Sequence, residues 1–248
     1  MELQGKTIWF VGASEGIGRA TALELAKRGA VLCVSARQQD KLDALVAELP
    51  GQGHRAIACD VTDVQSVQQA FAAVAQPAAP DMLIYAAGTY APMGAKDWKL
   101  DATLQTLDVN LNGALRVLSE TLPAMLARNS GTVVIVSSVA AYRGLPKSMG
   151  YGASKAALTN LAESMRIDLH GTGVDVRLVS PGFVKTRLTD QNEFTMPNLI
   201  TPERAARYIA DGIAKEHYDI HFPPAFSLFM KLMRILPNRL YFAIARSL

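Results

Sequence analysis

The sequence is short of charged residues and of cysteines, and each shortage excludes a class of protein. Charged residues make up only 19% of the 248 residues, against a usual ~25%, while 50% are hydrophobic. This composition argues against a disordered chain and indicates a large core, or a surface shared with another subunit. The two cysteines, Cys33 and Cys59, lie 26 positions apart in apolar runs, which excludes a disulfide scaffold and favours a reducing compartment.

Long hydrophobic runs and a strong charge imbalance are also absent. No uncharged apolar run approaches the ~20 residues that span a bilayer, and the segment from Met1 to Lys6 shows no signal peptide. The formal net charge of +3 is too small to indicate nucleic-acid binding. His54, His170, His217 and His221 do not cluster with carboxylates or cysteines, so no metal site is predicted. We expect a soluble, cytoplasmic protein that binds no nucleic acid.

Short β-branched runs alternate with helical patterns along the chain. Strand patterns cover residues 7–11, 31–35, 55–59, 82–86, 132–137, 174–179 and 218–222. Helical patterns cover residues 19–28, 41–49, 63–75, 104–128 and 153–169, and another helix opens at residues 201–203. This alternation predicts right-handed βαβ crossovers and a mostly parallel sheet covered on both faces. We therefore predict one doubly wound α/β domain over residues 1–248.

A glycine-rich turn separates the first strand pattern from the first helical pattern. Gly12, Gly16 and Gly18 occur there in the spacing Gly-x3-Gly-x-Gly. Glycine permits positive φ and close approach of the backbone to a ligand. The helix N-terminus that follows offers unpaired N–H groups to a pyrophosphate. The turn predicts a dinucleotide site, and a tight turn without a ligand is the alternative.

The end of the second strand pattern bears on the choice of cofactor. A site for the unphosphorylated ribose of NAD wants an acid about 20 residues after the glycines. Residues 35–39 contain Arg37 and no acid, and the first carboxylate is Asp40. Arg37 suits bidentate phosphate binding, which predicts NADP(H); the alternative is a solvated loop cation. Asp60, after the third strand pattern, is placed to bind the adenine amino group or to cap the next helix.

Four further residues form a candidate catalytic group. Tyr151 and Lys155 are four positions apart and therefore share one face of a helix. An ammonium group beside a tyrosine stabilises the phenolate, so the pair suits proton donation to a carbonyl. Ser138 ends the fifth strand pattern, where α/β proteins bind ligands; Ser137 is the alternative, since side chains alternate along a strand. Asn110 is a polar residue in a helical pattern, and an exposed helix asparagine is the alternative.

In order and spacing these motifs resemble those of the classical short-chain dehydrogenase/reductases. The similarity spans roughly residues 5–215 and comprises the glycine turn, Asp60, Ala87, Gly88, Asn110, Ser138, Tyr151, Lys155 and the segment from Pro181 to Thr186. Two positions depart from the family pattern. Val11 stands where the family usually has threonine, and Tyr85 and Ala86 stand where it has two asparagines. These departures put local hydrogen bonds near the adenine in doubt, not the chemistry.

The resemblance implies a Rossmann-type fold and a catalytic tetrad. In that scheme Tyr151 is the acid–base, and Lys155 binds the nicotinamide ribose and lowers the tyrosine pKa. Ser138 holds the carbonyl, and Asn110 supports a water-linked proton relay. The residues expected to contact the cofactor are Gly12, Ser14, Gly16, Ile17, Gly18, Arg37, Asp60, Val61, Ala87, Gly88, Tyr151, Lys155, Pro181, Gly182, Val184 and Thr186.

The function implied is an NADP(H)-dependent oxidoreductase that interconverts a carbonyl and an alcohol by hydride transfer. The expected substrate is a hydrophobic ketone or 3-oxoacyl compound, and the expected assembly is a homodimer or homotetramer. One alternative is a cofactor-binding regulatory or scaffold protein without turnover, against which the complete tetrad argues. Another is an epimerase or dehydratase, which usually needs more than the roughly 60 residues that follow the Pro-Gly segment.

Two apolar segments complete the prediction. Residues 186–200, which include Phe194, Met196 and Leu199, are expected to form the substrate lid. Residues 223–248 are expected to form a helical extension, and from residue 220 onward the chain has four basic and no acidic side chains. We expect this extension to pack on a neighbouring subunit or on the substrate pocket. An interfacial helix on anionic lipid headgroups is the alternative.

Overall fold

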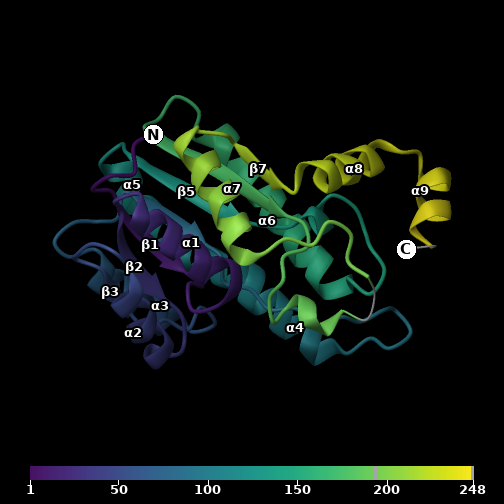
Figure 1. Ribbon diagram of the computed structural model, residues 1–248, viewed down its shortest axis with the longest axis horizontal. Coiled ribbons are helices and arrows are strands. Elements are labelled where there is room, and N and C mark those ends of the chain that lie inside the picture. The colour runs from purple at the N-terminus through teal and green to yellow at the C-terminus, as the bar shows by residue number, and fades with distance from the viewer. Residues whose placement is uncertain (193–194, 247–248) are drawn as a thin grey trace.

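Runs of β-branched and apolar residues form the strands of one sheet in the computed structural model, which describes residues 1–192 and 195–246 (Figure 1). The strands are β1 (Thr7–Val11), β2 (Val31–Ser35), β3 (Arg55–Ala56), β4 (Met82–Tyr85), β5 (Gly131–Val136), β6 (Val174–Pro181) and β7 (Asp219–Phe222). They form a seven-stranded sheet in the order β3-β2-β1-β4-β5-β6-β7, with every neighbouring pair parallel. The predicted doubly wound α/β fold is confirmed, and the order reverses between β1 and β4, where such sheets bind ligands.

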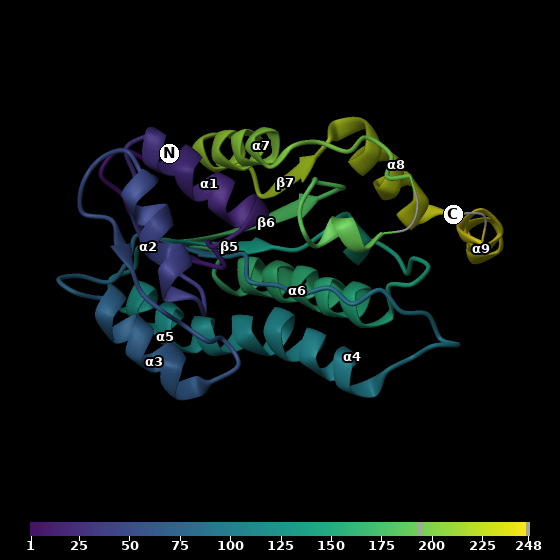
Figure 2. The same cartoon turned by 60° about the horizontal axis from the view of Figure 1, so that its bottom comes forward.

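Helices cover both faces of this sheet. They are α1 (Gly16–Lys27), α2 (Gln39–Glu48), α3 (Val64–Val74), α4 (Leu100–Leu107), α5 (Gly113–Ala127), α6 (Met149–Asp168) and α7 (Pro202–Ala214). Side chains of α1, α2 and α7 pack with one face of the strands, and those of α3, α5 and α6 pack with the other (Figure 2). Along β1, Ile8 and Phe10 join the first cluster, while Trp9 and Val11 join the second. Such burial on both faces explains why the strands read as continuous apolar runs.

Some helices differ from their predicted bounds. Helices α1 and α6 begin at Gly16 and Met149, earlier than residues 19 and 153, because glycines in their first turns weaken the helical pattern. The predicted helix over residues 104–128 is α4 and α5 joined by a π-helical turn, η1 (Asp108–Asn112). Strand β3 covers two residues rather than the predicted 55–59.

Two further helices follow β7. They are α8 (Pro224–Ile235) and α9 (Asn238–Ala245), separated at Pro237. The inner face of α8 packs Phe226 and Met230 against Val139 and Tyr142, with Phe183 beside them. Helix α9 projects beyond the body of the molecule in both views (Figures 1 and 2). Leu248, the last apolar residue of the expected extension, lies outside the described residues.

Arg143 ties these last helices to the loop that follows β5. Its Nη1 atom donates hydrogen bonds to the carbonyl oxygens of Met233 at 3.1 Å and Leu236 at 2.6 Å. Its Nη2 atom donates to Asn238 Oδ1 at 2.5 Å, and the guanidinium lies 3.9 Å from the centre of the Tyr241 ring. The corner between α8 and α9 is therefore held mainly by one side chain from outside it.

Replacing Arg143 with alanine is expected to loosen this corner without unfolding the sheet. Hydrogen bonds from a charged donor contribute about 1.5–3 kcal/mol each, so local opening should increase by about tenfold or more. Limited trypsin digestion followed by mass spectrometry measures the cleavage rate at Arg234 and Arg239. Arg128→Ala is the matched control, since Arg128 also donates to three carbonyls, distant in sequence from α8 and α9. Equal cleavage rates in the two variants would contradict the prediction.

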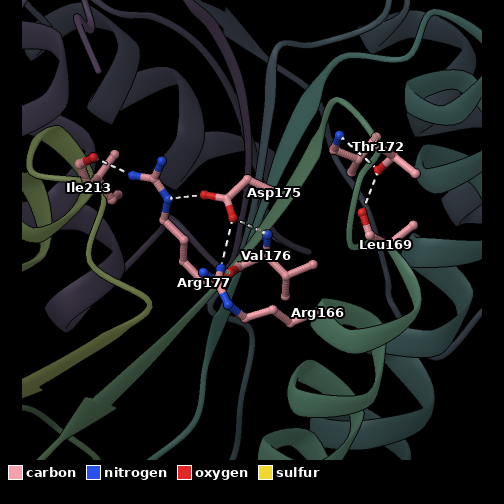
Figure 3. A network of polar contacts seen from close by, with 8 residues as sticks. Arg166, Leu169, Thr172, Asp175, Val176, Arg177 and Ile213 are labelled. Carbon is pink, nitrogen blue, oxygen red and sulfur yellow. Dashed lines mark hydrogen bonds and ion pairs between the residues drawn. The ribbon is translucent and has the colours of Figure 1, made fainter.

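A polar network fixes the amino-terminal end of β6. Arg177 is only 1% exposed, and its Nε donates to Asp175 Oδ2 at 2.8 Å (Figure 3). Its Nη1 donates to the carbonyl oxygen of Ile213 in α7. Asp175 Oδ1 accepts hydrogen bonds from Arg166 Nη1 and the Val176 amide, both at 2.9 Å. One carboxylate thus joins β6, α6 and, through Arg177, α7.

Candidate active site

The glycine turn lies at the carboxyl end of β1. At Gly12 and Gly18 the surrounding backbone leaves no space for a side chain. Gly12 has φ +92°, and a Cβ there would lie 2.3 Å from the Ala87 amide nitrogen. A Cβ on Gly18 would lie 2.0 Å from the Gly12 carbonyl oxygen. Among the described residues, no side chain caps the first amides of α1. Those amides can therefore bind an anion in front of the helix.

The structure brings several predicted cofactor residues to this turn. A Cβ on Gly16 would lie 3.0 Å from Thr186 Cγ2, so the loop after β6 contacts the turn. Ser14 and Ile17 belong to the turn itself. Val184 is buried and pairs with Ile200 in an isolated bridge. Pro181 and Gly182 lie at the carboxyl end of β6, where the Gly182 amide donates to the Phe222 carbonyl oxygen at 2.7 Å.

Arg37 and Asp60 follow β2 and β3, at the same carboxyl edge of the parallel sheet as the glycine turn. Arg37 is exposed. Asp60 Oδ1 accepts hydrogen bonds from the amide and hydroxyl of Thr62, at 2.9 and 2.8 Å. Burial acts to raise the pKa of Asp60, but the Thr62 bonds, with Arg37 and Arg116 nearby, outweigh it and lower the pKa.

The cap of α3 is a different aspartate. Asp63 is the N-cap residue, and its side chain accepts a hydrogen bond from the Gln65 amide at 2.9 Å. The alternative in which Asp60 caps this helix is therefore wrong. Val61, between them, is buried, and its carbonyl oxygen accepts a hydrogen bond from Arg116 at 3.1 Å.

The hydroxyl groups of Ser138 and Tyr151 lie close together at the carboxyl end of β5, near enough for the serine to lower the pKa of the tyrosine. Ser138 Oγ accepts a hydrogen bond from the Ala140 amide at 3.1 Å, which fixes the serine at the start of a short helical turn. Ser137 Oγ instead donates to the Lys155 carbonyl oxygen at 2.8 Å. Of the two serines, the structure places Ser138 beside Tyr151.

Burial shapes the acid–base properties of Tyr151 and Lys155. Burial raises the pKa of Tyr151, and the nearby Ser138 hydroxyl only partly opposes this shift. This is opposite to the lowering that the resemblance implies. Lys155 is 4% exposed, and burial lowers its pKa to about 8. Its Nζ lies 5.7 Å from the centre of the Tyr151 ring and donates to the Val136 carbonyl oxygen at 2.9 Å.

Asn110 is fully buried within the π-helical turn η1, so the exposed-helix alternative is wrong. Its Oδ1 accepts from the Thr89 amide at 2.7 Å, and its Nδ2 donates to the Thr89 carbonyl oxygen and to Ser154 Oγ. A Cβ on Gly88 would lie 3.4 Å from Asn110 Oδ1 and 3.6 Å from Lys155 Nζ. Asn110 therefore holds the loop after β4 against α6.

Two side chains at the site are absent from the sequence prediction. The Tyr90 ring lies 5.0 Å from the Tyr151 ring, edge to face, and its hydroxyl donates to Asn192 Oδ1 at 3.1 Å. Glu15, at the N-cap of α1, pairs with Lys41 and, at 3.4 Å, with Arg187. The hydrogen bond from Lys41 lowers the pKa of Glu15. An aromatic residue two positions after Gly88 was the available signal for Tyr90, whereas nothing local marks the Glu15 pairs.

Comparisons with known proteins identify the family of the chain and agree with its fold. The family model for short chain dehydrogenases matches residues 6–196. A Myxococcus xanthus protein named as an uncharacterized oxidoreductase is 36% identical over 250 residues, covering 100% of this chain and 99% of that protein. A solved short chain dehydrogenase from Burkholderia cenocepacia in complex with NADP has a TM-score of 0.86 at 23% identity, over 99% of each chain. Another, from Burkholderia phymatum in complex with NAD, has a TM-score of 0.85 at 24% identity, over 94% of each. At these identities the two solved structures bear on the fold alone.

Proposed function

Because the chain belongs to the short chain dehydrogenase family, we propose that it is an NADP(H)-dependent oxidoreductase interconverting a carbonyl and an alcohol. One observation carries the proposal. The Ser138 and Tyr151 hydroxyls lie close together at the carboxyl end of β5, with Lys155 and Asn110 buried beside them. Two hydroxyls in this position can bind one substrate oxygen together.

The residues present fit a nicotinamide dinucleotide. The uncapped amides of α1 suit its pyrophosphate, and the absence of a side chain at Gly88 leaves the backbone accessible beside Asn110 and Lys155. Lys155 Nζ has three N–H donors and, among the described residues, one acceptor, the Val136 carbonyl oxygen, so its other donors can bind ribose hydroxyls. When bound, the cofactor supplies or accepts the hydride at the substrate carbon.

The chain's own residues then hold the substrate and move the proton. Ser138 holds the substrate oxygen against Tyr151. Since burial raises the Tyr151 pKa, its phenol is protonated at neutral pH, which is the form that donates a proton to a carbonyl. Asn110 keeps the loop at Thr89 fixed through both polar atoms of its side chain. Lys155 would bind the ribose of the cofactor. Its ammonium charge stabilises the phenolate that remains when Tyr151 gives up its proton.

Residues 186–200 are assigned as the substrate lid. Tyr90 connects this segment to the site: its hydroxyl donates to Asn192, and its ring packs on the ring of Tyr151. Phe194 lies outside the described residues. The apolar composition of the lid supports a hydrophobic substrate. For the assembly we propose a homodimer or homotetramer, as the resemblance to the family implies.

The activity itself is tested by following NADPH absorbance with a panel of ketones, aldehydes and 3-oxoacyl thioesters. The expected result is substrate-dependent oxidation of NADPH. Tight NADPH binding without turnover on any class would instead favour a regulatory or scaffold role.

Arg37 is proposed to bind the 2′-phosphate of the cofactor. Arg37→Asp should remove this contact and add repulsion, which together cost a few kcal/mol and weaken NADPH binding by about 100-fold. Fluorescence titration of NADPH and NADH into both proteins measures the change. Lys27→Asp, an exposed charge reversal at the other end of α1, should leave the preference unaltered. Equal affinities for the two cofactors in the parent would overturn the assignment.

A further inference from the structure

Helices α8 and α9 carry an apolar surface that the described chain does not cover. We define this tail surface by six side chains that are 44% to 76% exposed: Leu228, Phe229, Leu232, Ile235, Leu240 and Phe242. Four of them lie on the side of α8 away from Phe226 and Met230, which pack against the body. Helix α8 is thus apolar on its inner and its outer face. A cluster of large exposed apolar side chains ordinarily marks a contact site, so the outer face requires a covering partner.

The charged side chains of α8 and α9 are all basic. From residue 220 to 248 the chain has four basic and no acidic side chains. Lys231 pairs with Asp219 at 2.7 Å. Arg234, Arg239 and Arg246 are exposed and make no ion pair with the described residues. Three unpaired guanidinium groups therefore flank the apolar surface.

This combination favours a bilayer over a protein as the covering partner. In a protein interface each buried arginine needs its own carboxylate, because an unpaired buried charge is strongly destabilising. An anionic bilayer provides both requirements in one plane, with acyl chains for the apolar side chains and phosphates for the arginines. Helix α8 leads outward from the body to α9, so both helices lie at the periphery of the molecule (Figure 1).

We propose that α8 and α9 dock the protein on the surface of an anionic lipid bilayer. The six tail-surface side chains enter the boundary between headgroups and acyl chains, and Arg234, Arg239 and Arg246 lie at the lipid phosphates. The docking is peripheral: within residues 1–192 and 195–246, every helix is too short or too polar to cross a membrane. Because the inner face of α8 contacts Val139 and Phe183, the docked helices lie next to the loops that follow β5 and β6.

Sedimentation of the full-length chain with lipid vesicles tests this proposal. The chain should bind vesicles of equal parts phosphatidylcholine and phosphatidylglycerol at least about tenfold more tightly than vesicles of phosphatidylcholine alone. Raised salt should weaken the binding, because it screens the arginine contacts.

Two matched variants locate the contact. Ile235→Asp on α8 should reduce vesicle binding by about tenfold or more, while Ile167→Asp on α6 should leave it unchanged. The two isoleucines are 76% and 74% exposed, so neither substitution disturbs the core. Arg239→Glu should weaken binding, and Arg239→Lys should retain it. Circular dichroism and NADPH titration verify that each variant is folded.

Three results would overturn the proposal. The first is failure of the parent to sediment with anionic vesicles. The second is equal loss of binding in the Ile235→Asp and Ile167→Asp variants. The third is an oligomer, seen by light scattering, that dissociates on Ile235→Asp, since this would show that a second copy of the chain covers the tail surface. None of these results depends on the reaction that the protein catalyses.

Discussion

Tyr151→Phe is expected to lower kcat by about 100-fold or more, because it removes the positioned proton donor. The phenylalanine ring keeps the edge-to-face contact with Tyr90, whose ring centre lies 5.0 Å away. Stability and NADPH affinity should therefore remain close to those of the parent. Steady-state kinetics and fluorescence titration of NADPH measure the two quantities separately.

Two other variants test whether the loss of kcat is specific to the Tyr151 hydroxyl. Tyr208→Phe removes a hydroxyl from a tyrosine that stacks on Phe222 at 5.4 Å, and it should leave kcat unchanged. Lys155→Ala should reduce both turnover and NADPH affinity, because the ammonium group is assigned to both. Near-normal turnover in Tyr151→Phe would assign the acid role to a different group.

Asp175→Ala is expected to lower the free energy of unfolding by about 3 kcal/mol. The reason is that Arg177, 1% exposed, would keep the Ile213 carbonyl as its one hydrogen-bond acceptor among the described residues, and a buried charge without its paired counter-ion costs about 3–5 kcal/mol. The lower end of this range applies because the Asp175 side chain is 40% exposed, so water can reach the site. Urea unfolding followed by circular dichroism measures the change.

The control for this prediction is a surface ion pair. Glu48 pairs with Arg19 at 2.5 Å, but both side chains are at least 36% exposed, so Glu48→Ala should cost at most about 1 kcal/mol. Adding Arg177→Met to Asp175→Ala should recover part of the lost stability, since the buried charge is then gone. A loss below about 1 kcal/mol for Asp175→Ala alone would contradict the role assigned to the network.

The sequence predicts most strands well and β3 poorly. Strands β1 and β2 match their predicted bounds, because they are short apolar runs between helices. At β3 the predicted five-residue strand is two residues long, whereas β7 at the opposite edge begins one residue later than predicted. After β3 the chain still follows β2: the Ile57 and Cys59 amides donate to the carbonyl oxygens of Val34 and Ala36.

In the candidate site, the motifs identify residues but not their environment. Spacing alone placed Tyr151 and Lys155 on one helix face, and the structure brings Ser138 to the same point. The π-helical turn at Asn110 was not predicted, because it depends on contacts with Thr89 and Ser154 that are distant in sequence. The pKa of Tyr151 was expected to be lowered by the neighbouring lysine, whereas burial raises it in the structure.

Arg143 provides a route for thermodynamic linkage between the candidate active site and the last two helices. It belongs to the loop between Ser138 and Tyr151, and it grips the corner of α8 and α9. Linkage is reciprocal: if holding α8 and α9 changes the affinity for substrate by some factor, bound substrate changes the grip on α8 and α9 by the same factor. A ligand that orders the loop would then act as an effector of whatever binds the last helices, with Arg143 carrying the coupling free energy.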